Sequence, residues 1–120
     1  MGLPKIGEGW IAETELHYKL VAAFPTIDII HHGKPKWLGR QHLDIYLPQL
    51  KIGIEYQGFQ HFKPVKFFGG LKAFNYRKKL DERKKTLCKN HQCELIFILP
   101  NYNFDELVNT IQDRIGHVLL

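Results

Sequence analysis

The sequence predicts an α/β fold with a central mixed β-sheet flanked by helices. Segments with helical periodicity alternate with short β-branched or alternating segments along the 120 residues. Their order is helix, strand, two strands joined by a turn, helix, strand and helix. Such an order places helices on both faces of one sheet. The length is that of one domain, so residues 1–120 are expected to form a single domain.

The first half of the chain contains one predicted helix and one predicted short strand. A helix is expected over Thr14–Ala23, where Leu16 and Leu20 share one face. The β-branched run Ile27–Ile30 predicts the first strand. The segment His32–Arg40, with two glycines and a proline, is expected to be a loop.

The clearest strands form a predicted hairpin in the middle of the chain. His42–Leu47 and Lys51–Gln57 alternate between apolar and polar residues and flank the turn-forming pair Pro48-Gln49. A two-residue turn there would gather Asp44 and Glu55 on one face, beside the space over Gly53. Apolar residues would line the other face. This turn would pair Leu47 with Leu50, Ile45 with Ile52, and Asp44 with Gly53. Leu43 would point to the same face of the sheet as Ile45.

The second half of the chain begins with a predicted loop, His61–Gly70. A long helix is expected over Leu71–Asn90 and a strand over Glu94–Leu99. Pro100-Asn101 then interrupts the chain before a final helix, Phe104–Gly116. With the hairpin, these elements complete the helix-flanked sheet.

Composition restricts the class of protein. The chain has 17 Lys and Arg against 12 Asp and Glu, a net charge of +5 and a pI near 9.3. This surplus favours nucleic acid, an anionic membrane or an acidic partner. No apolar run is long enough to span a bilayer, and no signal-peptide pattern precedes the first helix. We therefore expect a soluble, cytoplasmic protein that does not associate with membranes.

The two carboxylates of the predicted hairpin suggest a metal site. Carboxylates held close together repel each other unless a cation lies between them. An all-oxygen pocket suits Mg²⁺ or Mn²⁺ rather than zinc. Such an ion can activate water and neutralise charge on a phosphate, while the amide of Gln57 can orient the water. The alternative is that Asp44 and Glu55 are solvated residues on an exposed sheet face.

At these residues the sequence resembles the PD-(D/E)XK nuclease superfamily. The matching segment is Leu43–Phe62, LDIYLPQLKIGIEYQGFQHF, between GRQHLDIYLP and RKKLDERKKTLCKNHQCELIFI. It is most similar to the small domains related to very-short-patch repair endonucleases, over about Trp10 to Ile98. The resemblance implies a restriction-endonuclease-like core. It also implies an endonuclease that hydrolyses DNA phosphodiester bonds with Mg²⁺ or Mn²⁺ as cofactor.

The resemblance also assigns roles to individual residues. Asp44 and Glu55 match the metal ligands, and the Tyr56 carbonyl matches a backbone ligand. Gln57 stands where the family motif has lysine, which removes a positive charge beside the attacked phosphate. Glu15 matches an acidic residue that many members direct from the first helix at the metal.

Further candidates follow the second hairpin strand. Gln60 and His61 match a Gln-His pair in close relatives. His61 is the best candidate for a general acid or base, although a structural histidine is an equal alternative. His31 and His32 close the predicted first strand, where ordinary polar capping is the favoured interpretation. Cys88, His91 and Cys93 lack an obvious fourth ligand for zinc, and Cys88 is expected to pack in the core.

Positive charge is concentrated in the segment Arg77–Lys89. Seven basic residues minus two acidic ones give +5, the net charge of the whole chain. These residues could follow a phosphate backbone, or they could form the solvated face of an amphipathic helix. The predicted nucleic-acid-binding residues are Lys34, Lys36, Trp37, Arg40, Gln60, Arg77, Lys78, Arg83 and Lys84.

Several functions therefore remain open. Gln57 leaves room for a DNA-binding module of the same fold without turnover. RNA could replace DNA as the substrate, and a protein-interaction domain would bind neither. A single active site cuts one strand at a time, so double-strand cleavage would require a homodimer. The chain could equally act as the nuclease module of a larger protein.

Overall fold

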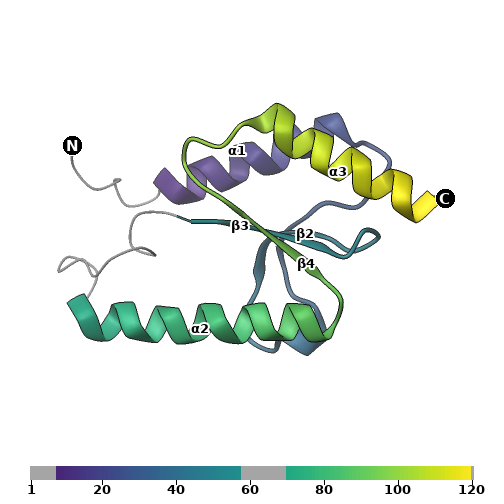
Figure 1. Ribbon diagram of the computed structural model, residues 1–120. Coiled ribbons are helices and arrows are strands. Elements are labelled where there is room, and N and C mark those ends of the chain that lie inside the picture. The colour runs from purple at the N-terminus through teal and green to yellow at the C-terminus, as the bar shows by residue number, and fades with distance from the viewer. Residues whose placement is uncertain (1–7, 58–69, 120) are drawn as a thin grey trace.

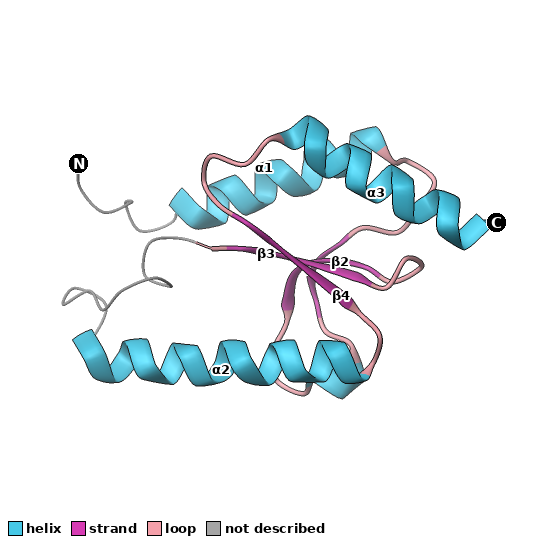
Figure 2. Ribbon diagram, viewed as in Figure 1, coloured by secondary structure: helices cyan, strands magenta, loops and turns pink. Residues whose placement is uncertain are grey.

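The computed structural model describes residues 8–57 and 70–119 and contains one four-stranded sheet between two helical layers (Figure 1). Helices α1 (Glu8–Ala23) and α3 (Phe104–Leu119) cover one face of the sheet. Helix α2 (Gly70–Asn90) lies on the opposite face (Figure 2). The predicted α/β class, with a mixed sheet flanked by helices, is confirmed. None of the described helices is long and apolar enough to cross a membrane.

The strands follow one another in space in the order of the chain. They are β1 (Ile30–Gly33), β2 (Leu43–Leu47), β3 (Ile52–Tyr56) and β4 (Glu94–Ile98). The pairs β1–β2 and β2–β3 are antiparallel, whereas β3 and β4 are parallel. A parallel pair needs a crossover connection, and α2 supplies it.

Most predicted elements lie where the periodicity placed them, with two differences at the start of the chain. Helix α1 begins at Glu8 rather than Thr14. The predicted strand Ile27–Ile30 is wrong, because pairing with β2 begins only at Ile30. The N–H of Ile27 instead donates to the Phe24 carbonyl in a turn. A short 3₁₀ helix, η1 (Lys36–Leu38), lies in the predicted loop.

The predicted hairpin register is wrong by two residues. Ile45 pairs with Ile54 and Leu47 with Ile52, and Gly53 pairs with Tyr46 instead of Asp44. A two-residue hairpin turn needs a positive φ at its first residue, which the proline ring of Pro48 forbids. The chain therefore forms a longer turn, in which the Leu50 N–H donates to the Leu47 carbonyl and Lys51 has a φ of 54°. A shift of two does not exchange the faces of a regular strand, and Ile45, Leu47 and Ile54 keep their predicted face.

The sheet separates two hydrophobic clusters. The larger one lies under α1 and α3, and the smaller one lies under α2 and η1. Leu43 was predicted to share the face of Ile45, but it packs in the smaller cluster. The missing side chain of Gly53 makes this possible, since a Cβ there would lie 2.8 Å from Leu43 Cδ2. The predicted space over Gly53 is therefore filled. The buried residues of the larger cluster are Leu16, Leu20, Phe24, Ile45, Leu47, Ile52, Ile54, Ile98, Leu107 and Ile111.

Two glycine substitutions are expected to change stability in opposite directions. A Cβ on Gly33 would lie 2.5 Å from the Tyr46 Cβ in the neighbouring strand. We expect Gly33→Ala to lower the free energy of unfolding by about 1–3 kcal/mol. Gly116 lies in α3 with nothing within 4 Å of its added Cβ, so Gly116→Ala should raise that energy by about 0.5–1 kcal/mol. Urea unfolding of both variants checks this, and equal effects would contradict the strand contact.

Candidate active site

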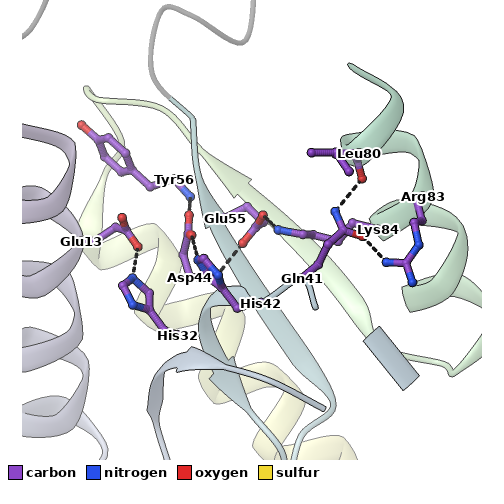
Figure 3. A network of polar contacts seen from close by, with 10 residues as sticks. All are labelled: Glu13, His32, Gln41, His42, Asp44, Glu55, Tyr56, Leu80, Arg83 and Lys84. Atoms are coloured by element: carbon purple, nitrogen blue, oxygen red, sulfur yellow. Dashed lines mark hydrogen bonds and ion pairs between the residues drawn. The ribbon is translucent and has the colours of Figure 1, made fainter. Parts of the chain in front are cut away.

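Asp44 and Glu55 meet where the β2–β3 ladder ends, and each carboxylate accepts a hydrogen bond from the other strand. The Asp44 N–H donates to Glu55 Oε2 at 2.7 Å, and the Tyr56 N–H donates to Asp44 Oδ2 at 2.8 Å (Figure 3). At this point, hydrogen bonds from backbone N–H groups to side-chain carboxylates replace the backbone hydrogen bonds between the two strands. The sequence predicted this pair, and the hydrogen bonds hold both carboxylates between the strand ends.

Lys84 brings a positive charge from α2 to this pair. Its Nζ donates a hydrogen bond to Glu55 Oε1, and the two side chains are 12% and 11% exposed. Lys84 precedes the buried Cys88 by one helical turn, so it lies on the face of α2 that packs on the sheet. The sequence predicted Lys84 as a nucleic-acid contact, whereas the structure places it against Glu55.

The acidic residue that α1 directs at the pair is Glu13. Its side chain is 15% exposed, and burial, together with the charge of Asp44 and a hydrogen bond to it, raises the pKa of Glu13 to about 8. Glu15 was predicted for this place, but it is 65% exposed and lies 3.6 Å from Lys19. Residues two apart on a helix point in nearly opposite directions, so α1 cannot direct both inwards.

The charges of the site act unequally on the two hairpin carboxyls. Burial alone would raise the pKa of Asp44, but hydrogen bonds from His42 and the Tyr56 N–H, with the charge of Lys84, lower it. Burial and the charge of Asp44 raise the pKa of Glu55, although Lys84 opposes them. Asp44, Glu55 and Glu13 therefore influence one another's ionisation, and Lys84 is the positive charge that opposes their repulsion.

Two histidines of β1 approach Glu13 from its other side. Glu13 Oε1 lies 3.4 Å from His32 Nε2 and 3.8 Å from His31 Nε2. Within the described part of the chain, Glu13, His31 and His32 form a group of possible metal ligands. Their imidazole nitrogens and carboxylate oxygen all lie within 4.8 Å of one another. The sequence interpretation of both histidines as polar caps missed this group. The signal available was the adjacent pair itself, in a strand bordering the predicted site.

Some of the predicted nucleic-acid contacts have roles within the fold. Arg83 Nη1 donates to the Leu38 carbonyl at 3.0 Å and to Gln41 Oε1. Trp37 stacks on His91 with the ring centroids 4.7 Å apart. These contacts hold the β1–β2 connection against α2 and against His91 in the turn that follows it. Of the remaining candidates, Arg77 is half-buried, and those with exposed positions are Lys34, Lys36, Arg40 and Lys78.

The end of β3 carries the other predicted residues. The Gln57 N–H donates to the Ile98 carbonyl at 2.9 Å, which extends the pairing with β4 beyond Tyr56. Gln60 and His61 lie outside the described residues. Cys88, which was expected to pack in the core rather than to bind zinc, is buried in the smaller cluster.

Comparison with known proteins finds one similar viral sequence. The chain is 35% identical over 72 residues to Uncharacterized protein 307L of Invertebrate iridescent virus 6. The match covers 54% of this chain and 36% of the viral protein, so the chain spans about a third of that relative. No protein-family model matches the chain. No solved structure matches it either.

Proposed function

We propose that this protein is a divalent-metal-dependent endonuclease that hydrolyses DNA phosphodiester bonds on a restriction-endonuclease-like core. The observation that carries the proposal is the junction of β2 and β3, where Asp44 and Glu55 exchange hydrogen bonds with the opposite strand beside Lys84. The mixed sheet, with β4 parallel to β3 and helices on both faces, is consistent with such a core. The proposal agrees with the sequence resemblance.

The residues at the junction fit Mg²⁺ or Mn²⁺. Asp44 and Glu55 would bind the ion with oxygen ligands, which both ions prefer, and the Tyr56 carbonyl is the third candidate ligand. Burial, followed by the charges of Asp44 and Glu55, raises the pKa of Glu13 to about 8 against the opposing charge of Lys84. A bound ion supplies activation of water and stabilisation of charge on the attacked phosphate.

Lys84 supplies the positive charge that the motif lysine would provide and that Gln57 lacks. The family motif places a lysine two residues after the second carboxylate, where this chain has Gln57. In this protein α2 delivers a lysine to the same carboxylate, with its Nζ on Glu55 Oε1. The replacement of the motif lysine therefore need not remove positive charge from the site.

Exposed lysine and arginine side chains would make the phosphate contacts outside the site. Arg83 and Lys84 bond within the fold, so we assign the DNA backbone to the lysines and arginine that remain exposed on α2 and on the β1–β2 connection. Such contacts make binding strongly dependent on salt. These residues are Lys34, Lys36, Arg40, Lys72, Lys78, Lys79 and Lys89, and they do not include Lys85, which lies 3.7 Å from Glu82.

Cleavage of supercoiled plasmid tests the function. The parent protein is incubated with Mg²⁺, Mn²⁺ or EDTA, and Glu55→Gln is purified in the same way to control for contaminating nucleases. We expect cleavage with either metal, none with EDTA, and at least about a hundredfold loss in the variant. Glu82→Gln is the matched control, because Glu82 is a 72% exposed residue of α2. Nicked or linear product then indicates whether one or two active sites act together.

Three outcomes would contradict the nuclease. Cleavage that survives in Glu55→Gln would come from another site or another protein. Salt-sensitive DNA binding without cleavage would favour the DNA-binding module. Preference for RNA over DNA of the same sequence would change the substrate assignment.

A further inference from the structure

A second group of metal-ligating side chains joins α1 to the edge strand β1. It consists of Glu13, His31 and His32, whose ligand atoms lie within 4.8 Å of one another. The exposed fractions of these side chains are 15%, 20% and 29%. Figure 3 shows the carboxylate of Glu13 directed at the ring of His32, on the side of Asp44 away from Glu55. The group therefore borders the Asp44–Glu55 pair without sharing either residue.

The backbone of β1 is bent so that both rings reach the same carboxylate. Consecutive residues of a regular strand point to opposite faces, and adjacent histidines would normally diverge. His32 has a φ of 56°, a left-handed conformation that non-glycine residues seldom adopt. As a result, the His31 and His32 ring centroids are only 4.1 Å apart. Residues held in such conformations cluster at ligand-binding sites.

The surrounding residues keep the two imidazoles in the form that binds metals. Burial, with the neighbouring imidazoles, lowers the pKa of His31 and of His32, so both are neutral at pH 7. The ring of His17 stacks on His31 at 5.4 Å and its Nε2 is bonded to the Ile29 carbonyl. Neutral imidazole nitrogens and one carboxylate match the preference of Zn²⁺ and similar transition-metal ions, whereas Mg²⁺ prefers oxygen alone.

We propose that Glu13, His31 and His32 form a binding site for one Zn²⁺ or a related first-row transition-metal ion. The site goes beyond the nuclease function and does not depend on it. Three protein ligands leave a coordination position for water or another small ligand. The bound ion would tie α1 to β1, so it is expected to stabilise the folded state as well.

Direct metal binding tests the site without any activity assay. Tag-free protein, stripped with EDTA, is titrated with Co²⁺ as an optical probe and then with Zn²⁺ in competition. With Mg²⁺ in excess to occupy Asp44 and Glu55, we expect one Co²⁺ per chain, displaced by Zn²⁺ but not by Mg²⁺, and a rise in the unfolding temperature. His32→Ala and Glu13→Gln should each weaken binding at least about tenfold. The matched control is His117→Ala, since His117 is 74% exposed at the end of α3.

Several results would overturn the proposal. They are the absence of 1:1 binding by the parent, unchanged binding in His32→Ala, or displacement of Co²⁺ by Mg²⁺. Thiolate charge-transfer bands would assign the ion to Cys88 and Cys93 instead. If a variant fails to fold, the imidazole nitrogen resonances of the parent decide. Zn²⁺ should shift those of His31 and His32, and a spectrum in which they do not move contradicts the site.

Discussion

Lys84→Met is expected to slow metal-dependent DNA cleavage at least about a hundredfold, as much as the loss of Glu55 itself. The substitution keeps the length of the side chain but removes the charge that contacts Glu55 Oε1. Without it, the carboxyls of Asp44 and Glu55 repel each other more strongly, and positive charge beside the attacked phosphate is lost. Initial rates of plasmid cleavage at saturating Mg²⁺ measure the effect.

Lys85→Met is the matched control for this prediction. Lys85 follows Lys84 on the same helix, but its side chain is 48% exposed and lies 3.7 Å from Glu82. We expect its cleavage rate to stay within about twofold of the parent, because exposed ion pairs contribute little. If both variants cleave like the parent while Glu55→Gln does not, Lys84 has no part in the reaction.

A second substitution distinguishes lost charge from lost structure. Gln57 lies two residues after Glu55, so a lysine there would point to the same side of the chain. We therefore expect Gln57→Lys to restore part of the cleavage lost in Lys84→Met. A folded double variant, with a normal unfolding transition but no recovery, would show that the position of the ammonium group on α2 is essential.

The long elements of the fold were predictable because their periodicity extends over several turns. The sequence placed α2 and α3 within a few residues of their observed bounds. The turn after β4 was equally clear, since Pro100 cannot continue a strand. Short elements were less certain. The β-branched segment before β1 packs against the core, but it has no partner strand, which no local pattern reveals.

The carboxylate pair was predictable, although its register was not. Alternation along the strands predicted that Asp44 and Glu55 come together, and a register error of two residues does not exchange the faces of a regular strand. The exact pairing depended on the turn, where the fixed φ of Pro48 excluded the two-residue geometry. Pro48 therefore carried information on the register of β2 and β3 that the alternation of the strands did not.

The contributions of the helices to the site required the tertiary structure. Glu13 lies three residues before Leu16, which is buried, and Lys84 lies four residues before the buried Cys88. Both spacings place the charged residue on the inward face of its helix. The sequence therefore contained a signal favouring Glu13 over Glu15. Only the packing reveals that Glu13 and Lys84 approach the same hairpin from opposite faces of the sheet.

The stability of the metal-free protein is expected to fall as pH rises through the neutral range, because Glu13 is protonated in the fold. Its pKa is about 8 in the folded chain and 4.5 for an ordinary glutamate. Between these values the folded chain holds a proton that the unfolded chain has released, so the free energy of unfolding decreases with pH. This contribution is fully present below about pH 4.5 and is lost once pH exceeds about 8.

The interval from pH 6.5 to 8 separates this effect from the histidines and cysteines, whereas Glu55, whose pKa is also raised, acts in the same direction. The lowered pKa values of His31 and His32 act below 6.5, and the raised pKa of Cys93, about 12, acts above 9. At about 1.4 kcal/mol per pH unit, 1.5 units correspond to roughly 2 kcal/mol. Urea unfolding in EDTA should show this loss in the parent and most of it abolished in Glu13→Gln. Glu15→Gln, which changes an exposed carboxyl, should keep the parental slope; a flat profile in the parent would mean that Glu13 is ionised in the fold.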